Sequence, residues 1–160
     1  MRPSLERLLK LYLDTSVLNF VFAEDAPQEQ EITKKLFHQA QLHKSYQFYI
    51  SGIVIREIEK APVSKREKLS ALADDIIVLD VTETVEPLAR TYLNSGAMPT
   101  GAIEDARHVA VATIHNLDAV VSWNFKHLVN LRRIKLVNLV NEAMGYKHIE
   151  IISPREVIIL

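Results

Sequence analysis

Short apolar runs alternate with longer amphipathic stretches along most of this 160-residue chain. The runs are rich in β-branched residues and too short for stable helices, which is typical of strands. They cover residues 9–14, 46–51, 76–81, 119–123 and 149–153. The first is ambiguous, because LERLLKLYL also fits a helical pattern. Helical periodicity between the runs predicts helices over 27–44, 66–75, 85–96 and 100–117. This alternation favours an α/β fold with a mostly parallel central sheet.

The length and composition of the chain are typical of one globular domain spanning residues 1–160. Hydrophobic residues make up 48% and charged residues 24%, which argues against disorder. The chain has no cysteine, which excludes disulfides and fits a reducing cytoplasm. No long uncharged apolar run or signal peptide is recognisable, so a cytoplasmic protein without membrane contact is expected. The net charge of −1 means that nucleic acid would have to bind to local basic patches.

The first apolar run ends on an acid. In LYLDTSVLNF, Asp14 directly follows the apolar residues of the predicted strand. Burying an ionised carboxylate costs free energy unless water, a cation or a metal ion is close to it. Thr15 and Ser16 offer hydroxyl groups, but these do not neutralise a negative charge. In parallel sheets functional groups gather where strands end and helices begin, so Asp14 is predicted to lie at such a site.

Three further side chains are predicted to reach the same edge of the sheet. Glu57 lies early in the helix expected after the second strand, and Asp105 borders the buried face of the helix 100–117. Asn124 follows the fourth strand in the way that Asp14 follows the first. Glu104, by contrast, is explained by the helix dipole alone. A cluster of oxygen ligands of this kind suits Mg²⁺ or Mn²⁺ rather than zinc.

The segments LYLDTSVLNFVF and EDARHVAVATIHNLDAVVSWNFKHL together resemble the PIN domain, the metal-dependent nuclease fold of VapC-type toxins. The resemblance covers most of the chain and implies a three-layer α/β/α sandwich. It also implies an endoribonuclease that uses Mg²⁺ or Mn²⁺ to cleave RNA phosphodiester bonds, as the toxin of a type II toxin–antitoxin pair. An antitoxin protein partner and a homodimer are expected on the same ground.

The resemblance also assigns roles to individual residues. Asp14, Glu57 and Asp105 match the acids of the family motif that bind metal, and Ser16 and Thr15 are expected to support Asp14. Many members of the family carry a fourth acid where this chain has Asn124, whose amide can orient water or bind metal but adds no charge. This departure keeps open a second interpretation, a PIN-fold module that binds RNA or protein with weak or no catalysis.

A basic segment follows the fourth predicted strand. Residues 119–141 contain no acid, whereas Lys126, Arg132 and Arg133 lie close together in the sequence. As a group these cations are predicted to guide an RNA backbone, and the alternative is an exposed, solvated helix face. Among the histidines, His127 is the best placed for a phosphate contact. The apolar residues of 19–22 and of the helix 27–44 are expected to line an antitoxin groove or to belong to the core.

The other histidines and the single tryptophan are expected to have structural roles. No metal-ligand spacing of the His-Glu-Xaa-Xaa-His kind occurs, so His108 and His115 are interpreted as packing or hydrogen-bonding residues. Trp123 is interpreted as a core or interface residue. The proposed chemistry requires no histidine as a base.

Two other α/β classes place acids at strand ends. A receiver-like signalling domain could use Asp80 as its phosphoacceptor, but the acidic pair and the lysine that it needs are not where they should be. A haloacid-dehalogenase-type phosphatase requires a second acid two residues after the first, and this chain has Ser16 there. Both classes are therefore disfavoured.

Overall fold

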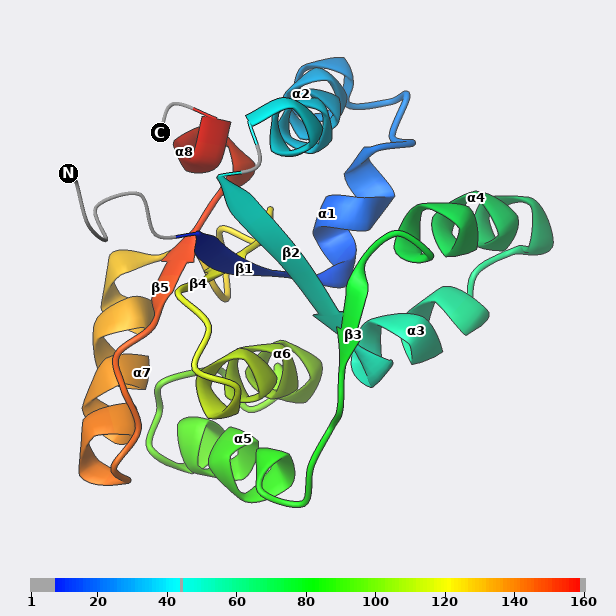
Figure 1. Ribbon diagram of the computed structural model, residues 1–160. Coiled ribbons are helices and arrows are strands. Elements are labelled where there is room, and N and C mark those ends of the chain that lie inside the picture. The colour runs from blue at the N-terminus through cyan, green and yellow to red at the C-terminus, as the bar shows by residue number, and fades with distance from the viewer. Residues whose placement is uncertain (1–7, 44, 159–160) are drawn as a thin grey trace, which may run out of the picture.

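A five-stranded parallel sheet forms the centre of the molecule in the computed structural model, which describes residues 8–43 and 45–158 (Figure 1). Its strands are β1 (Leu9–Leu13), β2 (Tyr46–Ser51), β3 (Ile77–Leu79), β4 (Ala119–Val121) and β5 (Glu150–Ile152). They lie in the order β3-β2-β1-β4-β5, and each neighbouring pair is parallel. The five predicted strands and the predicted parallel sheet are therefore confirmed.

Helices cover both faces of this sheet. They are α1 (Thr15–Phe20), α2 (Pro27–His43), α3 (Gly52–Glu59), α4 (Val63–Ala73), α5 (Val85–Asn94), α6 (Ile103–Ile114), α7 (Leu131–Ala143) and α8 (Pro154–Ile158). Figure 1 shows α1, α2 and α8 on one side of the sheet and α5, α6 and α7 on the other. This is the expected three-layer α/β/α sandwich. Within the described ranges no helix is both long and apolar enough to cross a membrane.

Element boundaries differ from the sequence-based prediction where local signals were misleading. Helix α6 begins at Ile103 rather than Thr100, and Ala102 precedes it without a side-chain cap. Helix α7, with 13 residues, was not given bounds in the prediction. Helices α1 and α8 were not predicted, because six and five residues are too few to show a helical period. Gly96, expected to follow the end of a helix, does so with a φ of 81°. A glycine adopts this left-handed conformation without steric cost.

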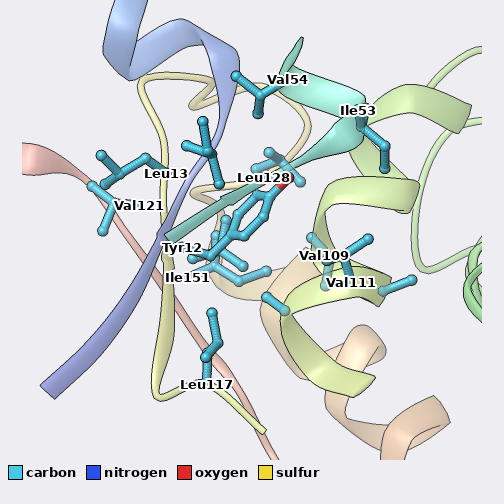
Figure 2. Packing of buried hydrophobic residues seen from close by; sticks show 14 of the residues in the cluster. Tyr12, Leu13, Ile53, Val54, Val109, Val111, Leu117, Val121, Leu128 and Ile151 are labelled. Atoms are coloured by element: carbon cyan, nitrogen blue, oxygen red, sulfur yellow. The ribbon is translucent and has the colours of Figure 1, made fainter. Parts of the chain in front are cut away.

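The ambiguous first segment is a strand because it is the middle of the sheet. Strand β1 pairs with β2 on one side and with β4 on the other, and Leu11, Tyr12 and Leu13 are fully buried. Figure 2 shows the ring of Tyr12 between the sheet and α6, on the side of Val109 and Val111. Burying each such side chain contributes about 1.5–3 kcal/mol, so this core fixes β1 and α6 relative to each other.

The strand order creates a crevice at one end of β1. From β1 the chain adds β2 and β3 on one side, and later adds β4 and β5 on the other. Such a reversal opens a crevice beyond the carboxyl ends of the two strands where it occurs. Leu13 pairs with Val121 across this junction, so Asp14 and Ser122 follow side by side.

The helices α5 and α6 are joined by an ion-pair cluster that gives a pH-dependent prediction. Arg107 contacts Glu86 at 2.8 and 2.9 Å and also contacts Glu104. The hydrogen bond from Arg107 lowers the pKa of Glu86 to about 2. A lowered carboxyl pKa adds stability above the ordinary value of 4.5, and this contribution is lost as the pH falls toward 2.

Replacing Arg107 with Met is therefore expected to reduce the free energy of unfolding at pH 7 by less than about 1 kcal/mol, because the partly exposed pair is screened by water. The difference from the wild type should shrink between pH 4.5 and 2, as measured by urea unfolding. Lys68→Met, at an exposed position of α4, is the control and should show no such trend. A difference that stays constant down to pH 2 would contradict the assignment.

Candidate active site

Asp14 lies at the carboxyl end of the central strand and caps α1. Its carboxylate is only 3% exposed. One oxygen accepts hydrogen bonds from Ser16 Oγ at 2.5 Å and from the backbone N–H of Val17 at 3.4 Å. The other accepts from Ser122 Oγ at 2.5 Å. Each carboxylate oxygen is thus oriented by a serine, and Ser16 supports Asp14 as predicted.

Burial makes the charged form of Asp14 costly. Desolvation raises the pKa of its carboxyl above the ordinary value, although His108 and the two serine hydroxyls act in the opposite direction. The nearby charge of Asp105 raises this pKa further. Because a bound cation would favour the ionised form, the crevice is a place where a cation would be stabilised.

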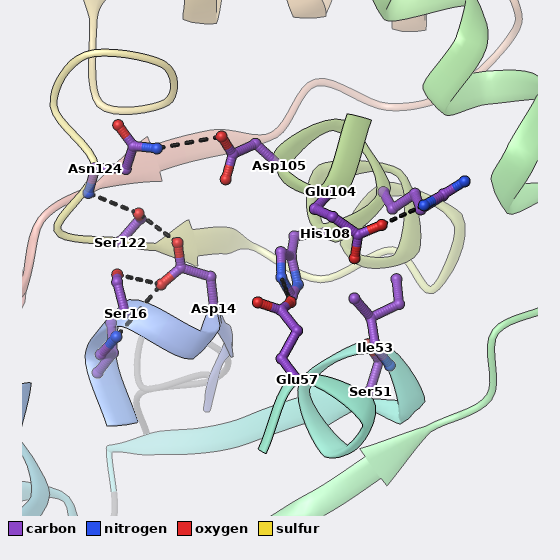
Figure 3. Close-up of polar contacts among 12 residues, drawn as sticks. Asp14, Ser16, Ser51, Ile53, Glu57, Glu104, Asp105, His108, Ser122 and Asn124 are labelled. Carbon is purple, nitrogen blue, oxygen red and sulfur yellow. Dashed lines mark hydrogen bonds and ion pairs between the residues drawn. The ribbon is translucent and has the colours of Figure 1, made fainter. Parts of the chain in front are cut away.

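A buried hydrogen-bonded chain holds the second acid. His108 Nε2 donates to Glu57 Oε1 at 2.7 Å, and His108 Nδ1 lies 2.6 Å from the hydroxyl of Tyr12. That hydroxyl is in turn 2.8 Å from Ser51 Oγ. The imidazole is 2% exposed, and both its nitrogens are occupied. His108 of α6 therefore connects β1 and the end of β2, through Tyr12, with helix α3, through Glu57. Figure 3 shows the side chains of His108 and Glu57 pointing toward each other.

His108 interacts electrostatically with all three acids. Burial raises the pKa of Glu57 and lowers that of His108, but their mutual hydrogen bond and charges outweigh burial. The pKa of Glu57 consequently lies below its ordinary value and that of His108 above it. Asp14 and Asp105 also raise the pKa of His108. All three predicted acids thus act on one buried imidazole, which partly offsets the desolvation of Asp14.

The third acid is linked to the first through the loop after β4. Asn124 Nδ2 donates to Asp105 Oδ2 at 3.2 Å, and His127 Nδ1 lies 3.1 Å from the same oxygen. The backbone N–H of Asn124 donates to Ser122 Oγ at 2.9 Å, and Ser122 donates to Asp14. Figure 3 shows Asp14, Asp105 and Asn124 facing a common space. The role of His127 as a phosphate contact stays a prediction.

Thr15 leaves an oxygen without a partner at this edge. Its Oγ1 is buried and makes no hydrogen bond of acceptable geometry, yet it is close enough to Glu57 to lower the pKa of that carboxyl. An unpaired buried hydroxyl costs about 1–3 kcal/mol. Thr15 therefore presents an unused oxygen ligand beside the acids.

The donor set fits a hard divalent cation chemically. Carboxylate and hydroxyl oxygens are the ligands that Mg²⁺ prefers, and Mg²⁺ commonly takes only one or two carboxylates and keeps several waters. Among the described residues, no group of three or more His, Cys, Asp or Glu side chains is arranged to hold a metal ion. Here Glu57 is hydrogen-bonded to His108, and Asp105 to Asn124 and His127. The assignment of metal ligands therefore stays a prediction.

The cations predicted to bind RNA differ in their exposure and in their contacts with the protein. Lys126 and Arg132 are exposed. The guanidinium of Arg133 instead donates to the backbone carbonyl of Gly96 at 3.1 Å and approaches that of Ala97 at 3.5 Å. Arg133 thus joins α7 to the segment after α5, so its predicted contact with RNA would compete with these bonds.

The sequence analysis did not identify the polar residues that organise the acids. The hydrogen-bonding role expected of His108 is confirmed, but its charge and its contact with Tyr12 were not foreseen. One signal was available, because His108 lies one helical turn after Asp105 and shares its face. The parallel register would also have placed Ser122 beside Asp14, once β1 and β4 were known to be neighbours.

Comparisons with known proteins agree with this fold. No curated protein is similar enough in sequence to match the chain. The crystal structure of VapBC2 from Rickettsia felis, bound to a DNA fragment from their promoter, is similar with 18% identity and a TM-score of 0.54. The similarity covers 74% of this chain and 90% of that one. The PIN domain family model matches residues 11–127, a range that contains all of the predicted acids. The chain therefore belongs to the PIN domain family, whose members are generally nucleases.

Proposed function

We propose that this protein is a metal-dependent endoribonuclease that cleaves RNA phosphodiester bonds with Mg²⁺ or Mn²⁺. The observation that carries the proposal is that Asp14, at the carboxyl end of β1, and Asp105 both act electrostatically on the buried side chain of His108, to which Glu57 is hydrogen-bonded. A cluster of acids at such a crevice is costly to the fold and is typical of a functional site. Membership of the PIN family supports the same activity.

The metal would be held by Asp14, Glu57 and Asp105, with Thr15 Oγ1 and Asn124 Oδ1 as neighbouring oxygens. When bound, a divalent ion of this kind polarises a phosphate oxygen and lowers the pKa of a bound water, which can then attack phosphorus. The carboxylates supply the negative charge that attracts the cation to the crevice.

The remaining residues orient the acids. Ser16 and Ser122 fix the two oxygens of Asp14, and Asn124 fixes Asp105. His108 acts as a positioning residue for Glu57 rather than as a base, because both its ring nitrogens already contact protein groups, the Tyr12 hydroxyl and the Glu57 carboxylate. This agrees with the expectation that no histidine takes the proton of the attacking water.

A toxin–antitoxin role is the biological setting that we propose for this activity. The structurally similar VapBC2 is a two-component complex, and we infer that this chain likewise has an antitoxin partner and forms a homodimer. Half-buried Phe20 and Phe22 line a groove with Lys65 and Lys68 of α4. The groove lies at the C-terminal end of α1, whose N-terminus is capped by Asp14, so an antitoxin segment that continued from the groove along α1 would approach the acids.

The proposal is tested by incubating the purified protein with single-stranded RNA and Mn²⁺ or Mg²⁺, with EDTA in a parallel reaction. Cleavage is expected with the metal ions and not with EDTA. If the protein binds RNA but cleaves no RNA with either metal, the second interpretation, a PIN-fold module without catalysis, takes its place.

The amide at position 124 gives a separate prediction about metal affinity. Asn124→Asp places a second carboxylate against Asp105 and is expected to lower the melting temperature in EDTA by like-charge repulsion. Mn²⁺ should then raise the melting temperature more than in the wild type, because a ligand that binds the native state stabilises it. Asn94→Asp, at an exposed position at the end of α5, should leave the Mn²⁺ shift unchanged. An equal shift in Asn124→Asp and wild type would contradict a cation near residue 124.

A further inference from the structure

One exposed aromatic ring belongs to the loop that contacts the third acid. Phe125 is 51% exposed, and among residues 8–43 and 45–158 no other Phe, Tyr or Trp is in the exposed class. Its neighbours in sequence, Asn124 and His127, both contact Asp105. Phe125 therefore lies in the same short loop as the residues that orient the third acid.

The loop that carries Phe125 is fixed from within. The backbone N–H groups of Leu128 and Val129 both donate to the carbonyl of Asn124, at 3.1 and 2.9 Å. Asn124 Oδ1 accepts from the N–H of His127 at 2.9 Å, and the side chain of Leu128 is fully buried as an anchor. An exposed apolar ring on a hydrogen-bonded loop loses little conformational entropy on binding, which favours recognition.

Aromatic rings and a cation support Phe125 from behind. The ring of Trp123 lies edge-on to that of Phe125, with ring centroids 6.1 Å apart. The ring centroid of Phe20 lies 5.5 Å from that of Trp123. Trp123 is anchored by a hydrogen bond from Nε1 to Thr33 Oγ1 at 2.9 Å. The guanidinium of Arg155 lies 5.7 Å from the centroid of Trp123. The group is thus rigid, aromatic and positively charged at its rim.

We propose that Phe125 is a stacking platform for one unpaired base of the RNA strand, next to the phosphate that is cleaved. Base stacking on aromatic rings, combined with nearby cations, is the general means of binding single-stranded nucleic acid without base-specific hydrogen bonds. The exposed residues Lys126, which follows Phe125 in the chain, and Arg155, which contacts Trp123, supply these cations. A stacking platform requires a base with a free face, and paired bases do not offer one. We therefore expect the substrate to be single-stranded RNA rather than a duplex.

This inference rests on the proposed ribonuclease function and is tested by binding rather than cleavage. The parent is the Asp14→Asn variant in EDTA, which should not cleave and which reduces the negative charge of the metal-free crevice. Affinity for a labelled single-stranded RNA of about 12 nucleotides, within the site sizes seen for such proteins, is measured by fluorescence anisotropy at several salt concentrations. The variants are Phe125→Ala, Phe125→Leu and Phe125→Trp, with Leu139→Ala as the control.

The expected result depends on aromaticity rather than on apolar bulk. Phe125→Ala and Phe125→Leu should each weaken binding by about 5- to 150-fold, the range found when a stacking aromatic is removed. Phe125→Trp and Leu139→Ala, an exposed apolar position on α7, should bind as the parent does. The dependence of affinity on salt should not change in the Phe125 variants, because no phosphate contact is lost. Annealing the RNA to its complement should weaken binding to the parent.

Three results would overturn the platform. The first is an affinity of Phe125→Leu for RNA equal to that of the parent. The second is an equal affinity of the parent for single-stranded RNA and for the duplex. The third is no measurable binding of RNA by the parent. The first result would show that RNA binding does not depend on an aromatic ring at position 125. Cleavage by the wild type with Mn²⁺ is scored separately, so an active enzyme without aromatic-dependent binding refutes only the platform. Aromatic-dependent binding without cleavage refutes only the nuclease.

Discussion

Asp14→Asn is expected to reduce the rate of Mn²⁺-dependent RNA cleavage by at least about 100-fold. Replacing even a residue that only hydrogen-bonds to a metal ligand typically lowers metal affinity or activity by about 10–100-fold. The substitution keeps the size of the side chain and its hydrogen bond with one serine, but it removes the charge that would hold the cation. Cleavage is measured as the initial rate at saturating Mn²⁺. A rate equal to that of the wild type would rule out Asp14 as a metal ligand.

Thermal melts separate this loss of activity from a loss of folding. In EDTA the Asp14→Asn variant is expected to melt at the wild-type temperature or above it, because burial raises the pKa of this carboxyl and makes its charge unfavourable. Addition of Mn²⁺ should stabilise the wild type and have little effect on the variant. Asp75→Asn, which changes an exposed acid before β3, serves as the matched control and should behave as the wild type in both assays.

His108→Leu is expected to reduce the free energy of unfolding by about 1–3 kcal/mol, because it removes the buried partner of Glu57 and one of the two hydrogen bonds of the Tyr12 hydroxyl. The lower part of this range reflects the exposure of Glu57, whose side chain is 32% accessible. Urea unfolding in EDTA at neutral pH measures the effect. The pKa of Glu57 should rise toward its ordinary value, since the group that lowers it is gone.

A double-mutant cycle distinguishes the ion pair from simple packing. If the loss in His108→Leu comes from the unpaired carboxylate of Glu57, then adding Glu57→Gln should recover part of the lost stability. His108→Gln, which can still hydrogen-bond to both neighbours, should be less destabilised than His108→Leu. Additive effects of His108→Leu and Glu57→Gln would show that the two side chains are not coupled.

The sequence predicts the fold well because its signals are local. The five apolar runs fall on the five strands, and their alternation with helices is enough to specify a parallel sheet. Only β1 is ambiguous by periodicity, and its identity is decided by pairing with β2 and β4 on both sides. The missed helices α1 and α8 are short, and tertiary packing rather than propensity holds such segments.

The site is less predictable because its organisation depends on contacts between distant residues. Asp14, Glu57 and Asp105 were identified from their positions at the ends of strands and starts of helices. Their common neighbour, His108, shares a helix face with Asp105, but the sequence does not show that its imidazole also reaches β1 and α3. Phe125 was missed for a different reason, since only the structure distinguishes an exposed ring from a buried one such as Trp123.

The capping of α1 by Asp14 restricts how this position can change during evolution. One side chain both begins a helix and supplies the charge that the proposed chemistry needs, so selection for folding and selection for activity act on the same residue. Asn, Ser or Thr would keep the cap while abolishing the charge, whereas most other residues would lose both. A descendant that abandons catalysis is therefore expected to retain a small polar residue here, and its sequence would still resemble that of an active enzyme.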